Sequence, residues 1–362
     1  MRIAAMVGLV LLANPAWAAE EKVVNVYNWS DYVAPDTLEK FTKATGIKVN
    51  YDVYDSNEIV ATKLMAGKSG YDVVFPSASP FLASQIKAGA YQKLDRAKLK
   101  NFDKLDPAVM KTLASVADPD NLYSIPYQIS ATAIAYNIDK AAKAAPGMAF
   151  DSWSVLFDAD KAGKMKECGI SVLDTPTEVF PAALLYLGKN GASLATDDLK
   201  AAAAAITKIR PALKYIHSSR YINDMANGDT CMAHGYGGDL IQARNRADEA
   251  GKGVKLKVFI PKEGAVVNID AAAIPKDAPH PDNAHAFIDF LLNPEIMGAI
   301  TNTTGYANAV PASKAFVKKE ILADPVIYPP AEVSARLFQV PPADLAKERE
   351  RTRLWTTVKT GR

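Results

Sequence analysis

The feature that most constrains this fold is a regular alternation of strand and helix patterns near the start of the chain. Strand patterns occupy residues 23–29, 47–54 and 71–75. Helical patterns fill the two intervals between them, and Gly46 and Gly67 end these helices. Strands joined by helical crossovers pair in parallel, which predicts an α/β protein whose first three strands end at one edge of a sheet.

Aromatic, acidic and hydroxyl side chains follow these strand ends directly. Small molecules bind beyond the carboxyl ends of strands in open α/β sheets, so such side chains are candidates for ligand contact. The alternative is that Trp29 and Tyr32 pack under a loop while Asp31 faces water. The residues at these ends are Trp29, Ser30, Asp31, Tyr32, Asp55 and Ser77.

Residues 1–18 have the pattern of a secretory signal peptide. Arg2 precedes an apolar stretch that is too short to span a bilayer, and Ala16 and Ala18 form a small-residue cleavage site. No Cys follows this site, so we expect an exported protein that is not anchored to the membrane. The rest of the chain is longer than a single domain with one hydrophobic core usually is, which predicts two lobes.

A long uncharged strand pattern at residues 125–137 is interpreted as a strand that passes from one lobe to the other. We expect residues 19–130 and 255–307 to form the N-terminal lobe. Residues 131–254 and 308–362 are expected to form the C-terminal lobe. Each lobe is therefore built from two stretches that are distant in the sequence.

The charge balance argues against one class of partner. The chain has 42 Lys and Arg residues against 40 Asp and Glu residues, and its formal net charge is +2. Nucleic-acid-binding proteins normally carry a basic face or run, so this composition gives no support for a nucleic-acid partner.

Cys168 and Cys231 are the two cysteines of the chain. In an exported protein an even pair most often forms a disulfide, and we favour that pairing. Two reduced, buried thiols are the alternative.

Three acids in the second half of the chain stand out. Glu178 and Asp239 each follow a strand pattern. Glu178 also fits the capping box of Thr175, and Asp239 could cap a helix with Gln242 as its partner, so a purely structural role is open for both. Asp270 lies inside an apolar strand pattern, where a lone carboxylate costs several kcal/mol unless donors or a cation meet it.

Signatures of catalysis are incomplete. The loop from Gly235 follows a strand pattern as a dinucleotide fingerprint does, but Leu240 replaces its third glycine and no acid ends the next strand. No nucleophile elbow is present, and the four histidines lack metal-ligand spacing. We therefore expect no enzyme, no cofactor and no metal site. An exported dinucleotide-dependent enzyme is the less favoured alternative.

The remaining candidates are acids and aromatic rings at strand ends, and they favour a cationic ligand. Ammonium groups need charge-assisted acceptors and gain further from ring faces. No arginine accompanies the set, which argues against an amino-acid ligand. The set comprises Trp29, Asp31, Tyr32, Ser77, Glu178, Tyr236, Asp239, Asp270 and Tyr306.

The sequence also resembles a known family, the periplasmic putrescine- and spermidine-binding components of ABC polyamine importers, and most closely the putrescine-binding type. The resemblance spans essentially the whole mature chain. The segments that carry it are residues 26–32, 51–58, 76–79, 168–169, 176–180, 217–224, 238–239, 260–264, 306–308 and 351–355.

This resemblance implies a two-lobed periplasmic binding protein of type II, with a mixed sheet flanked by helices in each lobe and the ligand in the cleft between them. It implies a periplasmic monomer that captures a polyamine and delivers it to an inner-membrane ABC permease. It also implies the disulfide between Cys168 and Cys231. The residues at the family's ligand positions are Trp29, Ser30, Asp31, Tyr32, Ser77, Glu178, Tyr236, Asp239, Asn268, Asp270 and Tyr306.

Three positions depart from the family pattern. Tyr236 stands where the family often has Trp, Asn268 stands where the putrescine binder has Phe, and Pro80 replaces an aromatic residue. Losing a ring face removes about 0.5–2 kcal/mol of cation attraction. We expect putrescine to be favoured over spermidine, with agmatine or cadaverine as alternative cationic ligands.

Overall fold

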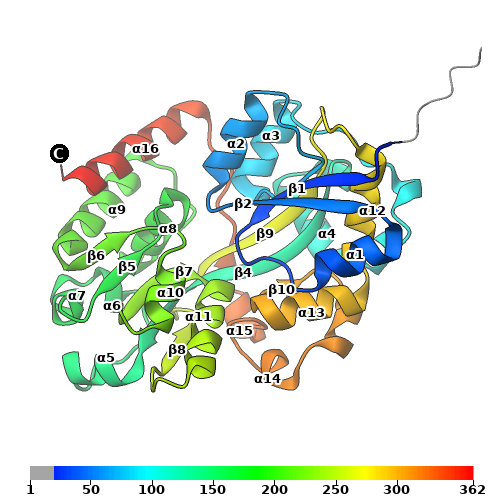
Figure 1. The fold of residues 1–362 in the computed structure, drawn as a ribbon. Coiled ribbons are helices and arrows are strands. Elements are labelled where there is room, and N and C mark those ends of the chain that lie inside the picture. Colours follow the sequence, from blue (N-terminus) through cyan, green and yellow to red (C-terminus); the bar gives the residue numbers. More distant parts are fainter. Residues whose placement is uncertain (1–19, 362) are drawn as a thin grey trace, which may run out of the picture.

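The computed structural model of the protein describes residues 20–361 (Figure 1). The predicted signal peptide at residues 1–18 lies outside the described residues. Within the described part, helices pack around a sheet that continues from one half of the molecule into the other, in the strand order β2-β1-β3-β9-β4-β7-β5-β6.

The first part of the sheet has the predicted alternation. Strand β1 (Val23–Trp29) pairs in parallel with β2 (Lys48–Tyr54) and with β3 (Val73–Val74). Helices α1 (Thr37–Thr45) and α2 (Asn57–Met65) connect these strands. The prediction of three parallel strands is therefore confirmed, and their carboxyl ends lie at one edge of the sheet.

Strand β4 (Ser124–Asn137) joins the two halves of the molecule (Figure 1). Its first part pairs with β9 (Ala265–Ala273) and β10 (Ala307–Asn308). Its second part pairs with β7 (Met232–Tyr236) and β8 (Leu256–Phe259). The prediction of a strand that passes between lobes is confirmed.

The second part of the sheet contains three parallel neighbours. Strand β5 (Ile170–Val172) lies between β6 (Leu213–Ile216) and β7 and pairs in parallel with both. Helices α8 (Pro176–Tyr186) and α10 (Tyr221–Ala226) follow β5 and β6 in the chain. Helix α11 (Gly237–Ala250) follows β7 directly, so each of these strand ends also leads into a helix.

The core is divided in the same way as the sheet. One apolar cluster surrounds the second part of the sheet and includes Trp153 and Trp355, whereas Phe41 and Phe287 belong to a cluster around the first part. The exact domain boundaries remain a prediction. One of them falls before β8, although β8 pairs with the second part of β4 and not with the first part of the sheet.

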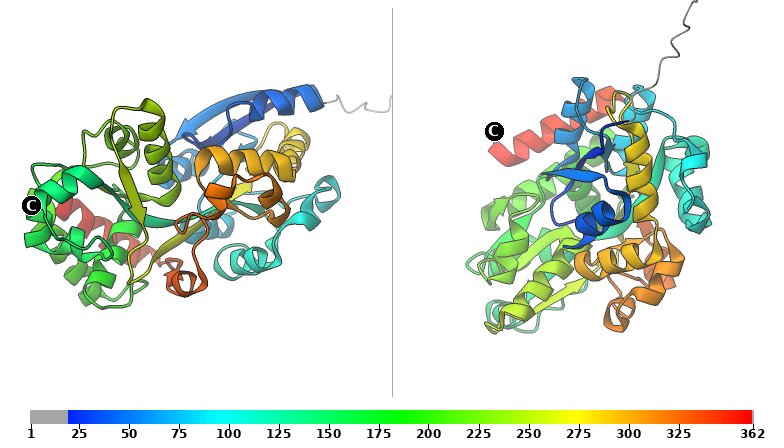
Figure 2. Two further views of the ribbon diagram at one scale, coloured as in Figure 1. Left: turned by 90° about the horizontal axis from the view of Figure 1, so that it is seen from below. Right: turned by 45° about the vertical axis from the view of Figure 1, so that its right-hand side comes forward.

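The C-terminal helix α16 (Leu345–Thr360) packs against α8 and α9 (Thr196–Ile209), as two further views show (Figure 2). The other elements are α3 (Ala83–Lys87), α4 (Pro107–Val116), α5 (Ile138–Ala144), α6 (Ser154–Phe157), α7 (Ala159–Met165), α12 (Pro281–Leu291), α13 (Pro294–Thr304), α14 (Lys319–Leu322), α15 (Ala331–Ser334) and β11 (Leu337–Phe338). No helix among residues 20–361 has both the length and the apolar character that a membrane crossing requires.

Cys168 and Cys231 form a disulfide, as predicted, with their Cα atoms 5.5 Å apart. The bond ties the segment before β5 to the start of β7. In the loop-entropy account, closing a loop of this length stabilises the fold by about 4 kcal/mol.

Candidate functional site

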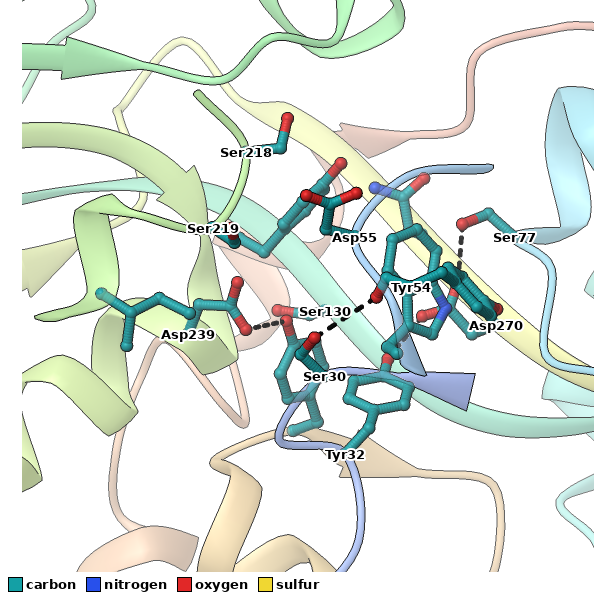
Figure 3. A pocket seen from close by; sticks show the side chains of 15 residues that line it. Ser30, Tyr32, Tyr54, Asp55, Ser77, Ser130, Ser218, Ser219, Asp239 and Asp270 are labelled. Atoms are coloured by element: carbon teal, nitrogen blue, oxygen red, sulfur yellow. Dashed lines mark hydrogen bonds between the residues drawn. The ribbon is translucent and has the colours of Figure 1, made fainter. Parts of the chain in front are cut away.

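A cavity lies where the carboxyl ends of the strands from both parts of the sheet converge (Figure 3). Side chains from both halves of the molecule enclose it. Its lining consists of Trp29, Ser30, Tyr32, Tyr54, Asp55, Ser77, Ser130, Ser218, Ser219, Ile222, Tyr236, Asp239, Asn268, Asp270 and Tyr306.

Trp29 forms part of the wall at the end of β1. Its indole Nε1 donates a hydrogen bond of 2.8 Å to the carbonyl of Phe75, and its ring packs 4.7 Å from that of Tyr54. Tyr54 in turn donates from its hydroxyl to the same carbonyl, at 2.6 Å. These bonds fix two aromatic faces beside the cavity.

Asp270 is held by hydroxyl groups from the first part of the sheet. It lies in β9, is 8 % exposed, and accepts a hydrogen bond of 2.6 Å from Ser77 and another from the Tyr32 hydroxyl. Burial raises the pKa of Asp270 to about 6, although these two hydrogen bonds favour the ionised form. A buried carboxylate held this way is a strong acceptor for a cation.

Asp239 is held by one hydroxyl from each half of the molecule. It lies in the first turn of α11 and is 9 % exposed. Its carboxylate accepts hydrogen bonds from Tyr221 (2.7 Å) and Tyr306 (2.8 Å). Burial raises its pKa to about 6, against the effect of the two hydroxyls. The capping alternative for Asp239 is wrong, because Tyr236 occupies the cap position and no side chain caps the helix.

The ring of Tyr306 reaches Asp239 by packing directly over Gly238. A Cβ atom at Gly238 would lie 1.9 Å from the Tyr306 ring, so only glycine allows this approach. The same ring lies 4.9 Å from that of Tyr32, edge to face. The glycine-rich turn therefore admits a tyrosine that connects Asp239 to the opposite side of the cleft.

Glu178 lies behind the cavity wall at the start of α8 and is 4 % exposed. Its Oε1 accepts a hydrogen bond of 3.0 Å from Nδ2 of Asn268, which lines the cavity. Within residues 20–361 its Oε2 has no hydrogen-bond partner. Burial raises the pKa of Glu178 to about 8. The capping-box alternative is wrong here too, because the Thr175 hydroxyl contacts Ser218 and caps no helical N–H.

Asp31, like Glu178, is a predicted site residue that does not line the central cavity. Its side chain is 49 % exposed and forms an ion pair of 3.1 Å with Arg246, on the opposite side of the cleft. Asp31 lines a separate groove and not the central cavity. The expectation that no arginine accompanies the acids was therefore wrong for this residue, because folding brings α11 beside the loop after β1.

Five lining residues were not anticipated as ligand candidates from the sequence: Tyr54, Ser130, Ser218, Ser219 and Ile222. Ser218 and Ser219 follow β6, a strand that the sequence patterns did not reveal. Tyr54 ends β2 just as Trp29 ends β1, so the rule that identified Trp29 would also have found Tyr54.

The chemistry of the lining suits an organic cation. Asp55, Asp239 and Asp270 contribute carboxylates, and none of the described residues that line the cavity is Lys, Arg or His. Four tyrosines and Trp29 supply ring faces. No group of acids, histidines and cysteines suited to a metal ion occurs among residues 20–361.

Comparison with known proteins gives a consistent pattern. Residues 36–329 match the family described as bacterial extracellular solute-binding protein. The chain is 52 % identical over 353 residues to the putrescine-binding periplasmic protein SpuD of Pseudomonas aeruginosa, covering 97 % of this chain and 95 % of that protein. It is 48 % identical to the putrescine-binding periplasmic protein PotF of Escherichia coli, covering 95 % of this chain and 93 % of that one.

A solved structure has the same architecture. A putative spermidine/putrescine ABC transporter protein from Listeria monocytogenes superposes with a TM-score of 0.82 at 29 % identity, covering 94 % of this chain and 100 % of that one. The similarity thus extends over both parts of the sheet and the cavity between them.

Proposed function

This chain belongs to the bacterial extracellular solute-binding proteins, among the periplasmic polyamine-binding proteins of ABC transporters, and from this premise we propose that it binds putrescine in the cavity between its two halves. The resemblance to SpuD and PotF, both described as putrescine-binding, supports putrescine over spermidine. The fold is that of a type II periplasmic binding protein.

The observation that carries the proposal is the pair of buried carboxylates Asp239 and Asp270. They belong to opposite sides of the cavity, and the charge of Asp239 contributes to raising the pKa of Asp270. Two such carboxylates repel each other until positive charge lies between them. A diamine supplies one ammonium group to each of the two acids. Its alkyl chain can pack against the aromatic rings that lie between them.

Ligand binding is coupled to closure of the cleft. Because Asp239 and Asp270 face each other only when the halves meet, a dication prefers the shut state to the open one. The shut form would then be the one that an inner-membrane ABC permease accepts. We propose that the protein acts as a monomer.

A catalytic role has less support. The turn at Gly235 to Asp239, which offered a weak dinucleotide pattern, is covered by the ring of Tyr306 over Gly238. We therefore propose that the protein binds and releases its ligand without changing a bond.

The identity of the diamine depends on Asn268 and Tyr236. Asn268 replaces an apolar ring with a polar side chain and already donates to Glu178. This makes one end of the cavity more polar, so agmatine and cadaverine are the competing ligands to test.

Isothermal titration calorimetry of putrescine, cadaverine, agmatine and spermidine tests the proposal. We expect putrescine to bind most tightly. Asp239→Asn should weaken its binding by about 2–5 kcal/mol, because one ammonium group loses its charged partner. Asp103→Asn, an exposed substitution outside the cavity, is the matched control. Wild-type affinity in the Asp239→Asn variant would contradict the proposal.

A further inference from the structure

Arg351 is a buried cation that the site described so far does not use. It lies in α16, is 2 % exposed, and lines a small cavity with Phe180 and Leu184 of α8. Its guanidinium donates to both carboxylate oxygens of Glu348 at 2.6 Å. Burying a guanidinium costs several kcal/mol unless its charge and donors are met, so this placement calls for an explanation.

The partners of Arg351 are incomplete. Within residues 20–361 its Nε has no hydrogen-bond partner, and Oε2 of Glu178 has none either. One is a donor and the other an acceptor, and both are buried, on helices that pack together. Such orphaned groups are rare in folded proteins because each costs about 1–3 kcal/mol.

The charge of Arg351 acts on Glu178 although no ion pair joins them among the described residues. Burial dominates the raised pKa of Glu178, and the hydrogen bond from Asn268 opposes it. Asp270 and Glu58 add to the raised pKa, whereas Arg351 lowers it. Arg351 is thus the one cation among the main influences on this carboxyl. The groups that face Glu178 are Asn268 and Asp270 on β9, Glu58 on α2, Tyr236 at the end of β7 and Arg351 on α16.

We propose that Arg351 is a positioning residue of the ligand site, which from the C-terminal helix favours the carboxylate form of Glu178 and so makes that carboxylate available to one end of a polyamine. The inference rests on the proposed function, since it requires Glu178 to meet an ammonium or guanidinium group. Arg351 itself touches no ligand. Arg351 lies beside Phe180 and Leu184 of α8, the helix that carries Glu178.

Arg351→Gln tests this role. Without the guanidinium, Glu178 should hold its proton to higher pH, so putrescine affinity at pH 7 should fall by about tenfold for each unit of upward pKa shift. The loss should shrink as the pH rises above about 8, where wild-type Glu178 is already ionised and the variant begins to ionise. Arg351→Lys should retain most of the affinity, and Arg353→Gln, on an exposed part of α16, should leave it unchanged.

Glu348→Gln tests the same role without replacing the buried Arg351. Glu348 is 34 % exposed and neutralises Arg351, so its removal should strengthen the effect of Arg351 and move the pH profile of putrescine binding to lower pH. If Arg351 has only a structural role, Glu348→Gln should not move the pH profile of putrescine binding to lower pH. This variant also serves if Arg351→Gln fails to fold, which circular dichroism and thermal unfolding would reveal.

A double-mutant cycle separates the two proposals. In a Glu178→Gln background, Arg351→Gln should cause no further loss of affinity. The inference is overturned if Arg351→Gln lowers affinity equally at every pH, or equally in that background, or leaves it at the wild-type value. If wild-type protein binds none of the polyamines, both the proposed function and this inference fail.

Discussion

Asp270 and Asp239 occupy matching places on opposite sides of the cavity but are held in different ways. Both are buried, both accept two hydroxyl hydrogen bonds, and burial raises both pKa values to about 6. The donors to Asp270 come from the same half of the molecule. Asp239 receives one of its two from Tyr306, on the opposite half.

The difference implies that Asp270 has both of its hydrogen bonds before the cleft closes. Asp239 gains its second hydrogen bond only on closure. Ser77 and Tyr32 hold Asp270 whatever the position of the second half. If the halves separate, Asp239 should lose its bond from Tyr306, and Glu178 should lose its bond from Asn268, because each bond joins the two halves. We infer that a diamine meets the Asp270 side first and that closure assembles the Asp239 side around its second amine.

The replacement of Asp270 should have the largest effect on putrescine affinity. Asp270→Asn leaves an ammonium group without its charged partner, and we expect putrescine affinity to fall by about 2–5 kcal/mol by calorimetry. If Asp270 makes the first contact, this variant should also slow association in stopped-flow measurements, whereas Asp239→Asn should mainly speed dissociation. Equal effects on both rates in the two variants would contradict the order of contacts.

Lowering the pH should weaken binding through both acids. Burial raises each pKa to about 6, so each carboxyl group mostly carries a proton at pH 5 and is largely ionised at pH 7. A bound dication needs the ionised forms, so affinity should fall by about tenfold per carboxylate between pH 7 and pH 5. Calorimetry in buffers of different ionisation enthalpy would report the released protons. An affinity independent of pH over this range would show that these acids do not contact the ligand.

Tyr306→Phe should affect closure more than Tyr221→Phe does. Both remove one hydrogen bond to the same carboxylate, worth about 1.5–3 kcal/mol because the acceptor is charged. Only Tyr306 connects the two halves, so its variant should show a larger radius of gyration with subsaturating putrescine in small-angle X-ray scattering. Identical scattering for both variants would contradict the inference that Asp239, unlike Asp270, depends on cleft closure for one of its hydrogen bonds.

Asn268→Phe should have the smallest effect. A ring at this position would restore a face for an ammonium group, and we expect putrescine affinity to rise by about 0.5–2 kcal/mol. The same change removes the donor to Glu178 and makes that end of the cavity less polar, which should disfavour a guanidinium group. The ratio of putrescine to agmatine affinity should therefore increase, as competition calorimetry would measure. A fall in that ratio would contradict the role given to Asn268.

Much of the scaffold follows from the sequence because its signals are local. Apolar periodicity located β1, β2 and the long β4, and the strand-end rule placed Trp29 and Ser77 beside one cavity. Asp270 was identified instead as a lone carboxylate inside an apolar strand. The two cysteines indicated the disulfide because pairing depends on compartment as well as on geometry.

The errors concern residues whose partners are distant in the chain. Local spacing allowed Glu178 and Asp239 to be helix caps, but their carboxylates turn to Asn268 and to Tyr221 and Tyr306 instead. Asp31 looked like a cavity acid until α11 brought Arg246 beside it. A capping box can be read from four residues, whereas these contacts depend on how helices pack.

By itself, the sequence determined the first three strands and the long β4, the edge at which those first strands end and the acidic, aromatic character of the side chains there, since hydrophobic periodicity and composition act over a few residues. Only the tertiary structure decided which hydroxyl meets which carboxylate and which acids bridge the cleft. The bond from Tyr32 to Asp270 spans 238 positions of sequence, and no local pattern encodes a contact between residues so far apart in the chain.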